Sequence, residues 1–250
     1  MKKYLLVLLV CNFYLLNAQK SAQDYYKTGL EAFETDNFKT AIVDLNQAIT
    51  KDKGNPDFYN LRGKIKEKLE DYRGAVMDYD KAIELKPDFA MAYYNRGLAK
   101  ENYGEYEGAI LDFTKSIEAN NNIALSYYHR GIVKYKLKDS KAAIADLDMA
   151  IEIDPQNADF YYVRGIARVL AEDYKAAITD LKKSIELYPQ NKNAYLYKGI
   201  AWEKQRIMRE SILSYNEAIR VDSTFARAYY RRACVKEELE DFRGAIADYT

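Results

Sequence analysis

Histidine and cysteine are scarce in this chain of 250 residues, which contains one histidine and two cysteines. Catalytic triads with a histidine base and multi-histidine metal sites both need histidine next to other polar groups. The one histidine, His129, lies among tyrosines and basic residues, and we interpret it as an exposed structural residue. We therefore predict that the chain is not an enzyme and that it holds no metal or other cofactor.

Neither sign of charge is in excess, since the chain has 38 basic and 38 acidic residues. Proteins that bind nucleic acids concentrate basic residues on one face or along one helix. No such basic stripe is present in the sequence. We expect no nucleic-acid partner.

Long hydrophobic runs are also missing, apart from a stretch of about a dozen residues near the N-terminus, residues 5–16, which follows two lysines. A basic start, a short apolar run and a small residue before a polar segment are typical of a secretory signal peptide. We predict that residues 1–18 form this peptide, that cleavage follows Ala18, and that residues 19–250 form the exported domain, which is periplasmic, secreted or on the cell surface. The run is short for a membrane span, which needs roughly 20 residues, so an uncleaved anchor is the lesser alternative.

Cleavage would remove Cys11 and leave Cys234 as the last cysteine, so the mature chain could form no internal disulfide. Attachment of a lipid at Cys11 is disfavoured because Val10 precedes it, where a small residue is expected. Cys234 stands where other segments carry Leu or Ile, which favours a small apolar packing residue over a nucleophile.

Glycine recurs with a period of 34 residues along most of the chain. A pair of residues made of Ala or Ser followed by Ile or Val keeps the same period, twelve residues later. The glycine positions, with alanine at the last, are Gly29, Gly63, Gly97, Gly131, Gly165, Gly199 and Ala233. Each period contains two helix-compatible segments of about 14 residues, roughly 21 Å at 1.5 Å per residue. A fixed period of this length indicates an array of identical units, here helical hairpins.

The repeated residues resemble those of the tetratricopeptide repeat family. With the glycine counted as position 8, the family's pattern of aromatic, small and proline residues is met in the second unit by Tyr59, Gly63, Tyr72, Ala75, Tyr79, Ala82 and Pro87. Basic residues before the glycine resemble a subclass that reads Tyr-x-x-Arg-Gly. The resemblance implies an all-α fold, a right-handed α-solenoid (superhelix) of seven 34-residue helix-turn-helix repeats, the last one incomplete. The repeats are expected to begin near residues 22, 56, 90, 124, 158, 192 and 226.

Charged residues follow the same period. Position 7 is Arg62, Arg96, Arg130, Arg164, Lys198 and Arg232, and position 23 is Asp44, Asp78, Asp112, Asp146, Asp180 and Asp248. We predict that these two sets pair as a structural ladder, with nitrogen to oxygen distances below about 4 Å. The sixth repeat carries Lys198 and Ser214 and lacks the acid, so we expect it to be the least stable repeat.

The remaining candidate for function is the concave surface that the resemblance implies, where the first helix of each repeat contacts ligands mainly through positions 2, 5, 9, 12 and 13. These positions are rich in tyrosine and apolar residues, which suit a protein partner. The predicted partner-binding residues are Tyr26, Tyr94, Leu98, Tyr128, Ile132, Tyr135, Tyr162, Ile166 and Tyr230. The alternative is that position 5 merely packs against the preceding repeat.

Chaperone-docking members of the family hold a peptide's terminal carboxylate with Lys and Asn at positions 5, 6 and 9. The nearest residues here are Asn60, Lys64 and Asn95, but Tyr94 and Leu98 occupy two of the required places. We predict that no such clamp forms.

Two functions follow from this sequence. The first is an exported scaffold whose tyrosine-lined groove binds a peptide segment or domain of another protein of the cell envelope, with self-association also open. The second is the recruitment module of a longer envelope protein, because residue 250 falls inside a predicted helix. In neither case does the sequence predict an integral membrane segment after the signal peptide.

Overall fold

The computed structural model describes residues 20–250, so the predicted signal peptide lies outside the described residues. Within this range the chain forms fourteen α-helices and no β-strand. The prediction of an all-α repeat fold is confirmed. Among these helices, none combines the length and the apolar character needed to cross a membrane.

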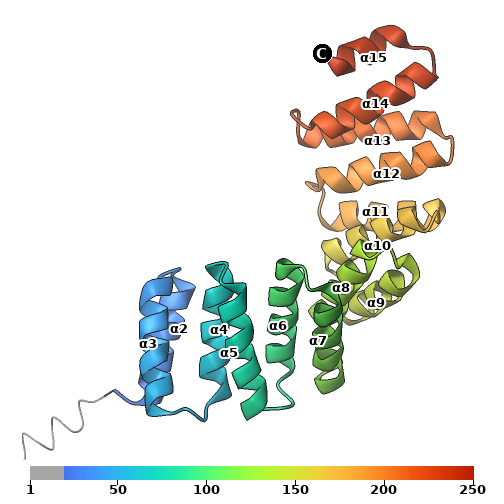
Figure 1. The fold of residues 1–250 in the computed structure, drawn as a ribbon. Coiled ribbons are helices and arrows are strands. Elements are labelled where there is room, and N and C mark those ends of the chain that lie inside the picture. The colour runs from blue at the N-terminus through green and yellow to red at the C-terminus, as the bar shows by residue number, and fades with distance from the viewer. Residues whose placement is uncertain (1–19) are drawn as a thin grey trace, which may run out of the picture. The chain divides into compact units, whose positions relative to one another are not determined.

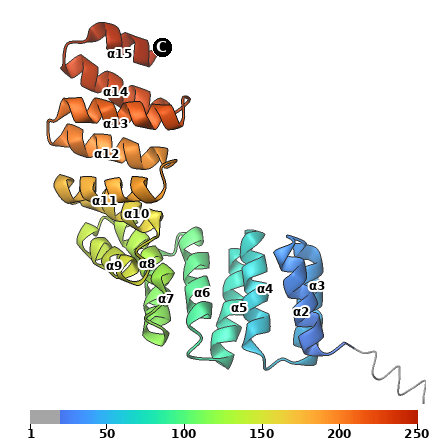
Figure 2. The same cartoon turned by 180° about the vertical axis from the view of Figure 1, so that it is seen from behind.

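The helices divide between two compact units. Unit 1, residues 20–119, contains α2 (Ala22–Glu34), α3 (Phe38–Lys51), α4 (Pro56–Lys68), α5 (Tyr72–Leu85), α6 (Ala90–Tyr103) and α7 (Tyr106–Ala119). Unit 2, residues 120–250, contains α8 (Ala124–Lys136), α9 (Ser140–Ile153), α10 (Ala158–Leu170), α11 (Tyr174–Leu187), α12 (Lys192–Lys204), α13 (Met208–Val221), α14 (Ala226–Glu238) and α15 (Phe242–Tyr249). Figure 1 shows that consecutive helices pair as hairpins and that hairpins stack within each unit, and Figure 2 shows the same from behind.

The two helices of a hairpin approach each other closely at the periodic glycine. In the sixth repeat, formed by α12 and α13, a Cβ at Gly199 would lie 2.4 Å from Cε1 of Tyr215. In the fourth repeat a Cβ at Gly131 would lie 3.1 Å from Cγ of Leu147. Both Tyr215 and Leu147 are fully buried. The periodic glycine therefore marks the point where the first helix meets the largest buried side chain of the second.

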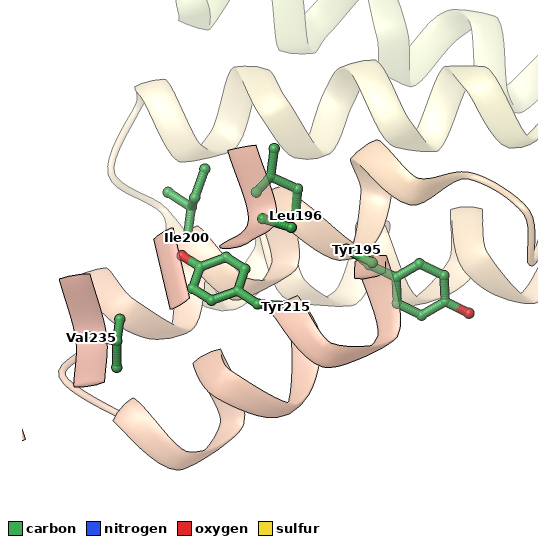
Figure 3. Close-up of a cluster of buried hydrophobic side chains, with 7 residues drawn as sticks. Tyr195, Leu196, Ile200, Tyr215 and Val235 are labelled. Carbon is green, nitrogen blue, oxygen red and sulfur yellow. The ribbon is translucent and has the colours of Figure 1, made fainter. Parts of the chain in front are cut away.

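The core of the sixth repeat shows how the aromatics supply bulk. Figure 3 shows Tyr215 beside Ile200, while the ring of Tyr195 points away from them. The Tyr215 hydroxyl donates to a carboxylate oxygen of Glu203 over 2.6 Å. Burial raises the pKa of Tyr215, so the hydroxyl stays protonated as a donor. This polar end lets a tyrosine fill an otherwise apolar interior.

The turn inside each hairpin places one residue in the left-handed region. Gly104 has φ +88° in the third repeat, and non-glycine residues take φ between 56° and 68° in the other six, namely Asp36, Glu70, Lys138, Glu172, Arg206 and Glu240. In most repeats the residue after this one caps the second helix. In the fifth repeat, for example, the side chain of Asp173 accepts a hydrogen bond from the backbone amide of Ala176. In the sixth repeat this residue is Ile207, which makes no side-chain cap.

The predicted ladder is present. Arg62, Arg96, Arg130 and Arg164 lie 2.5–2.6 Å from Asp78, Asp112, Asp146 and Asp180, and Arg232 pairs with Asp248. The aspartates are at most 6% exposed as side chains. These pairs join the two helices of one hairpin.

Two features of the ladder did not follow from the sequence reasoning. A second cation, at position 11, shares each aspartate, as Lys100 does with Asp112 at 2.8 Å. The arginine also reaches the second helix of the preceding repeat at position 25, because Nη1 of Arg96 donates to Asp80 and Nη1 of Arg164 donates to Asp148, both over 2.6 Å. The ladder therefore links neighbouring repeats as well as paired helices.

Candidate partner-binding face

The first helices of unit 2 gather four tyrosines, which we call the tyrosine cluster: Tyr128 of α8, Tyr135 of α8, Tyr162 of α10 and Tyr197 of α12. The rings of Tyr162 and Tyr197 meet edge to face, with centroids 6.1 Å apart. Burial raises the pKa of Tyr162, and the neighbouring Tyr197 adds to this shift, while Arg227 of α14 opposes it. Burial also raises the pKa of Tyr135, again with Tyr197 close by. The hydroxyls of Tyr162 and Tyr135 therefore stay protonated at neutral pH and can donate hydrogen bonds.

Each cluster tyrosine is half-buried, so part of every ring remains open to a ligand. Tyr128 packs on Phe160, the third residue of the next repeat, with ring centroids 4.9 Å apart. Tyr26 of α2 packs on Phe58 in the same way, at 5.2 Å. In these two repeats the residue at position 5 contacts the following repeat.

Branched apolar residues lie between the tyrosines of unit 2. Ile166 is 9% exposed and Ile200 is 7% exposed, and Ile132 is half-buried. Because so little of Ile166 and Ile200 reaches the surface, they act as the floor under the aromatic rings. A face with an apolar floor and hydroxyl-bearing walls can contact both the side chains and the backbone of a peptide.

At the C-terminal end of unit 2 the surface becomes charged. A cavity of about 340 Å³ is lined by Leu196, Ala226, Arg227, Tyr230 and Arg231. Tyr230 is 59% exposed, and Arg231 lies 3.4 Å from Glu203. Tyr230 is the most exposed of the predicted tyrosines, and its ring packs on that of Tyr249 with centroids 6.1 Å apart.

Unit 1 presents a different first-helix face. Tyr94 is 7% exposed, with its ring centroid 6.0 Å from that of Phe113. Most of the surface of this predicted contact residue is therefore buried in the core. Leu98 is half-buried. The amide of Asn95 donates to Asn60 over 2.9 Å, which engages two of the three side chains that come nearest to a carboxylate clamp.

Two members of the site were missed from the sequence. Tyr197 occupies position 6, which is not among positions 2, 5, 9, 12 and 13 from which the contact residues were predicted. Arg227 occupies position 2, which the pattern does include, and an arginine there was the available signal. The rejected catalytic candidates have structural surroundings, since His129 meets the ring of Tyr128 edge-on at 5.1 Å and the Cys234 sulfur lies 3.6 Å from the Tyr249 hydroxyl.

Family models decide what kind of protein this is. Models described as tetratricopeptide or TPR repeats match residues 68–102, 90–123, 128–191 and 162–224. The chain contains tetratricopeptide repeats. Among curated proteins no sequence match is found.

Solved tetratricopeptide structures share the fold. YrrB, described as a TPR protein with an unusual peptide-binding site, is 22% identical with a TM-score of 0.66, covering 74% of this chain and 95% of YrrB. The C-terminal part of a TPR repeat-containing protein from Cytophaga hutchinsonii is 19% identical with a TM-score of 0.74, covering 89% and 92%. A tetratricopeptide repeat protein from Parabacteroides merdae is 18% identical with a TM-score of 0.70, covering 92% and 91%. Identities this low establish the shared architecture alone.

Proposed function

We propose that this tetratricopeptide protein is an interaction scaffold that binds a segment of a partner protein on the first-helix face of unit 2. The observation that carries the proposal is the tyrosine cluster, four half-buried tyrosines from three successive repeats with an isoleucine floor. Partly exposed aromatic rings concentrate binding energy at protein interfaces. Their rigid rings also lose little conformational entropy when a partner is bound.

An extended or helical peptide suits this face better than a small molecule. Equivalent positions recur from one first helix to the next, so the contacts are spread along the stack in place of converging on one enclosed pocket. The peptide-binding site described for YrrB belongs to a protein of the same architecture, which supports a peptide as the ligand class. We further propose that the encounter takes place outside the cytoplasm, on the strength of the signal-peptide pattern in residues 1–18.

The test uses a phage-displayed library of random peptides, selected on the mature chain, with affinities of the enriched peptides measured by fluorescence anisotropy. The variant Tyr128→Ala/Tyr162→Ala is expected to bind at least about 30-fold more weakly, from about 2 kcal/mol for loss of an aromatic centre and 1.4 kcal/mol per tenfold. Tyr188→Ala is the matched control, because Tyr188 is 52% exposed and follows α11, away from the first helices. It should bind normally.

Circular dichroism shows whether the double variant keeps its helices. If it does not, the single variant Tyr162→Ala is used, because it leaves the contact between Tyr128 and Phe160 in place. Normal binding by a folded variant that lacks these rings, or selection of no peptide at all, would contradict the proposed site.

A further inference from the structure

The junction between the fifth and sixth repeats departs from the ladder seen elsewhere. Position 7 of the sixth repeat is Lys198, position 25 of the repeat before it is Lys182, and the buried aspartate is replaced by Ser214. At the corresponding junction one repeat earlier, Arg164 meets the carboxylates of Asp148 and Asp180, both at 2.6 Å. Position 25 is therefore a cation where it was an acid one repeat earlier, and the aspartate of position 23 is missing.

Packing fixes where these cations lie. The ammonium of Lys198 lies 5.3 Å from the centre of the Tyr195 ring, just as Arg164 lies 5.6 Å from that of Tyr161. Lys182 extends over the ring of Trp202 at 5.9 Å, and Trp202 takes the place of the second ladder cation. Lys198 is thus held in the ladder position although its acid is gone.

No internal carboxylate neutralises the pair. Within residues 20–250, no acidic oxygen lies within 4 Å of either ammonium. Burial lowers the pKa of Lys198, and the positive charge of Lys182 lowers it further, while Glu217 and Glu210 of α13 act in the opposite direction from longer range. Glu217 is paired with Arg220 at 2.6 Å. A half-buried cation next to a second cation is costly unless an anion joins them.

We propose that Lys182 and Lys198 form a binding site for a carboxylate side chain of a partner protein. The ladder itself points to a carboxylate, because aspartates hold the equivalent arginines at 2.5–2.6 Å in other repeats. Asp80 and Asp148, which stand at the position of Lys182 in other repeats, have side chains that are 54% and 50% exposed, so solvent and a partner's acid can reach this position.

This site lies on a different side of α12 from the tyrosine cluster. Successive residues of an α-helix turn by about 100°, so Lys198 projects roughly 100° away from Tyr197, the member of the tyrosine cluster on α12. A partner engaged here need not touch the first-helix face, and the two sites can be tested separately.

The experiment titrates the mature chain, labelled with ¹³C and ¹⁵N at lysine, with the peptide acetyl-Gly-Asp-Gly-amide, and follows the lysine side-chain NMR signals. The matched peptide with Asn in place of Asp controls for everything except the charge. The Asp peptide should shift the signals of Lys182 and Lys198 saturably, and the Asn peptide should not. Lys198→Met should weaken binding at least about tenfold, the loss of one charge-assisted hydrogen bond.

Two further variants sharpen the result. Ser214→Asp restores the ladder acid next to Lys198, so it should abolish binding while the fold is retained. Lys175→Met removes an exposed lysine elsewhere on α11 and should change nothing. The proposal is overturned if the Asn peptide binds equally, if Lys175→Met weakens binding as much as Lys198→Met, or if inorganic phosphate saturates the site and the Asp peptide does not.

Discussion

Replacing Gly199 with alanine tests the idea that the periodic glycine exists to admit a buried ring. The added methyl carbon would lie 2.4 Å from Cε1, 2.7 Å from Cδ1 and 3.0 Å from Cζ of Tyr215. Tyr215 is 0% exposed, and its hydroxyl bond to Glu203 holds the far end of the ring. The ring therefore cannot swing out of the way without losing that bond.

The expected magnitude follows from opposing effects. Alanine in place of a mid-helix glycine stabilises the helix by about 1 kcal/mol. Overpacking of a filled core costs about 1–3 kcal/mol, and loss of the tyrosine hydrogen bond adds about 1 kcal/mol. We expect Gly199→Ala to lower the free energy of unfolding by about 1–3 kcal/mol, measured by urea denaturation with circular dichroism and by amide exchange in α12 and α13.

Gly131→Ala is the matched control, since its added methyl would lie 3.1 Å from the Leu147 side chain, a contact that a small shift can relieve. The net effect of Gly131→Ala on the free energy of unfolding should be near zero. The seventh repeat carries Ala233 at this position, opposite Tyr249 of the last helix, which is 47% exposed. Equal stability of the Gly199→Ala and Gly131→Ala variants would refute the steric explanation.

Three other expectations concern charge and capping. Asp112→Asn should cost roughly 3 kcal/mol in urea denaturation, because the side chain is 1% exposed and two cations would lose their acid; an unchanged midpoint would contradict this. Ile207→Asp should add the missing cap and stabilise the sixth repeat by about 1 kcal/mol, and amide exchange in α12 and α13, which we expect to be faster than in α8 to α11, should slow. Hydrogen bonds from Lys192 and Thr224 lower the pKa of Asp222 from 3.8 to about 2, so its contribution is complete above pH 4 and is lost as pH falls toward 2. The melting temperature of Asp222→Asn should accordingly fall less steeply over that interval than that of the wild type.

Features that repeat along one chain were predictable from the sequence. The period of glycine and alanine predicted the hairpins, and the two helical segments expected in each repeat are observed, in the second repeat at Pro56–Lys68 and Tyr72–Leu85. The pairing of positions 7 and 23 was also predictable, because both partners recur in the same register.

Contacts that depend on the angle between neighbouring repeats were not predictable. The bond from Arg96 to Asp80 spans two repeats, and no spacing within a repeat indicates it. The surroundings of two first-helix tyrosines were likewise not predictable. Tyr94 turns into its own hairpin against Phe113, and Tyr197 joins Tyr162 from the next first helix, although the two belong to different repeat positions.

The link from each position-7 arginine to the preceding repeat has a consequence for how the stack comes apart. In a linear array the strength of coupling between neighbours sets how many repeats unfold together. Where an arginine binds one acid of its own repeat and one of the preceding repeat, unfolding of one repeat leaves a buried charge without its partner in the other. The two repeats are therefore expected to unfold together. Between Lys182 and Lys198 this coupling is absent, and that junction becomes a boundary of cooperativity. On this basis α12 to α15 can open as a group while α8 to α11 stay folded, which makes the C-terminal part of unit 2 the first to fray under stress.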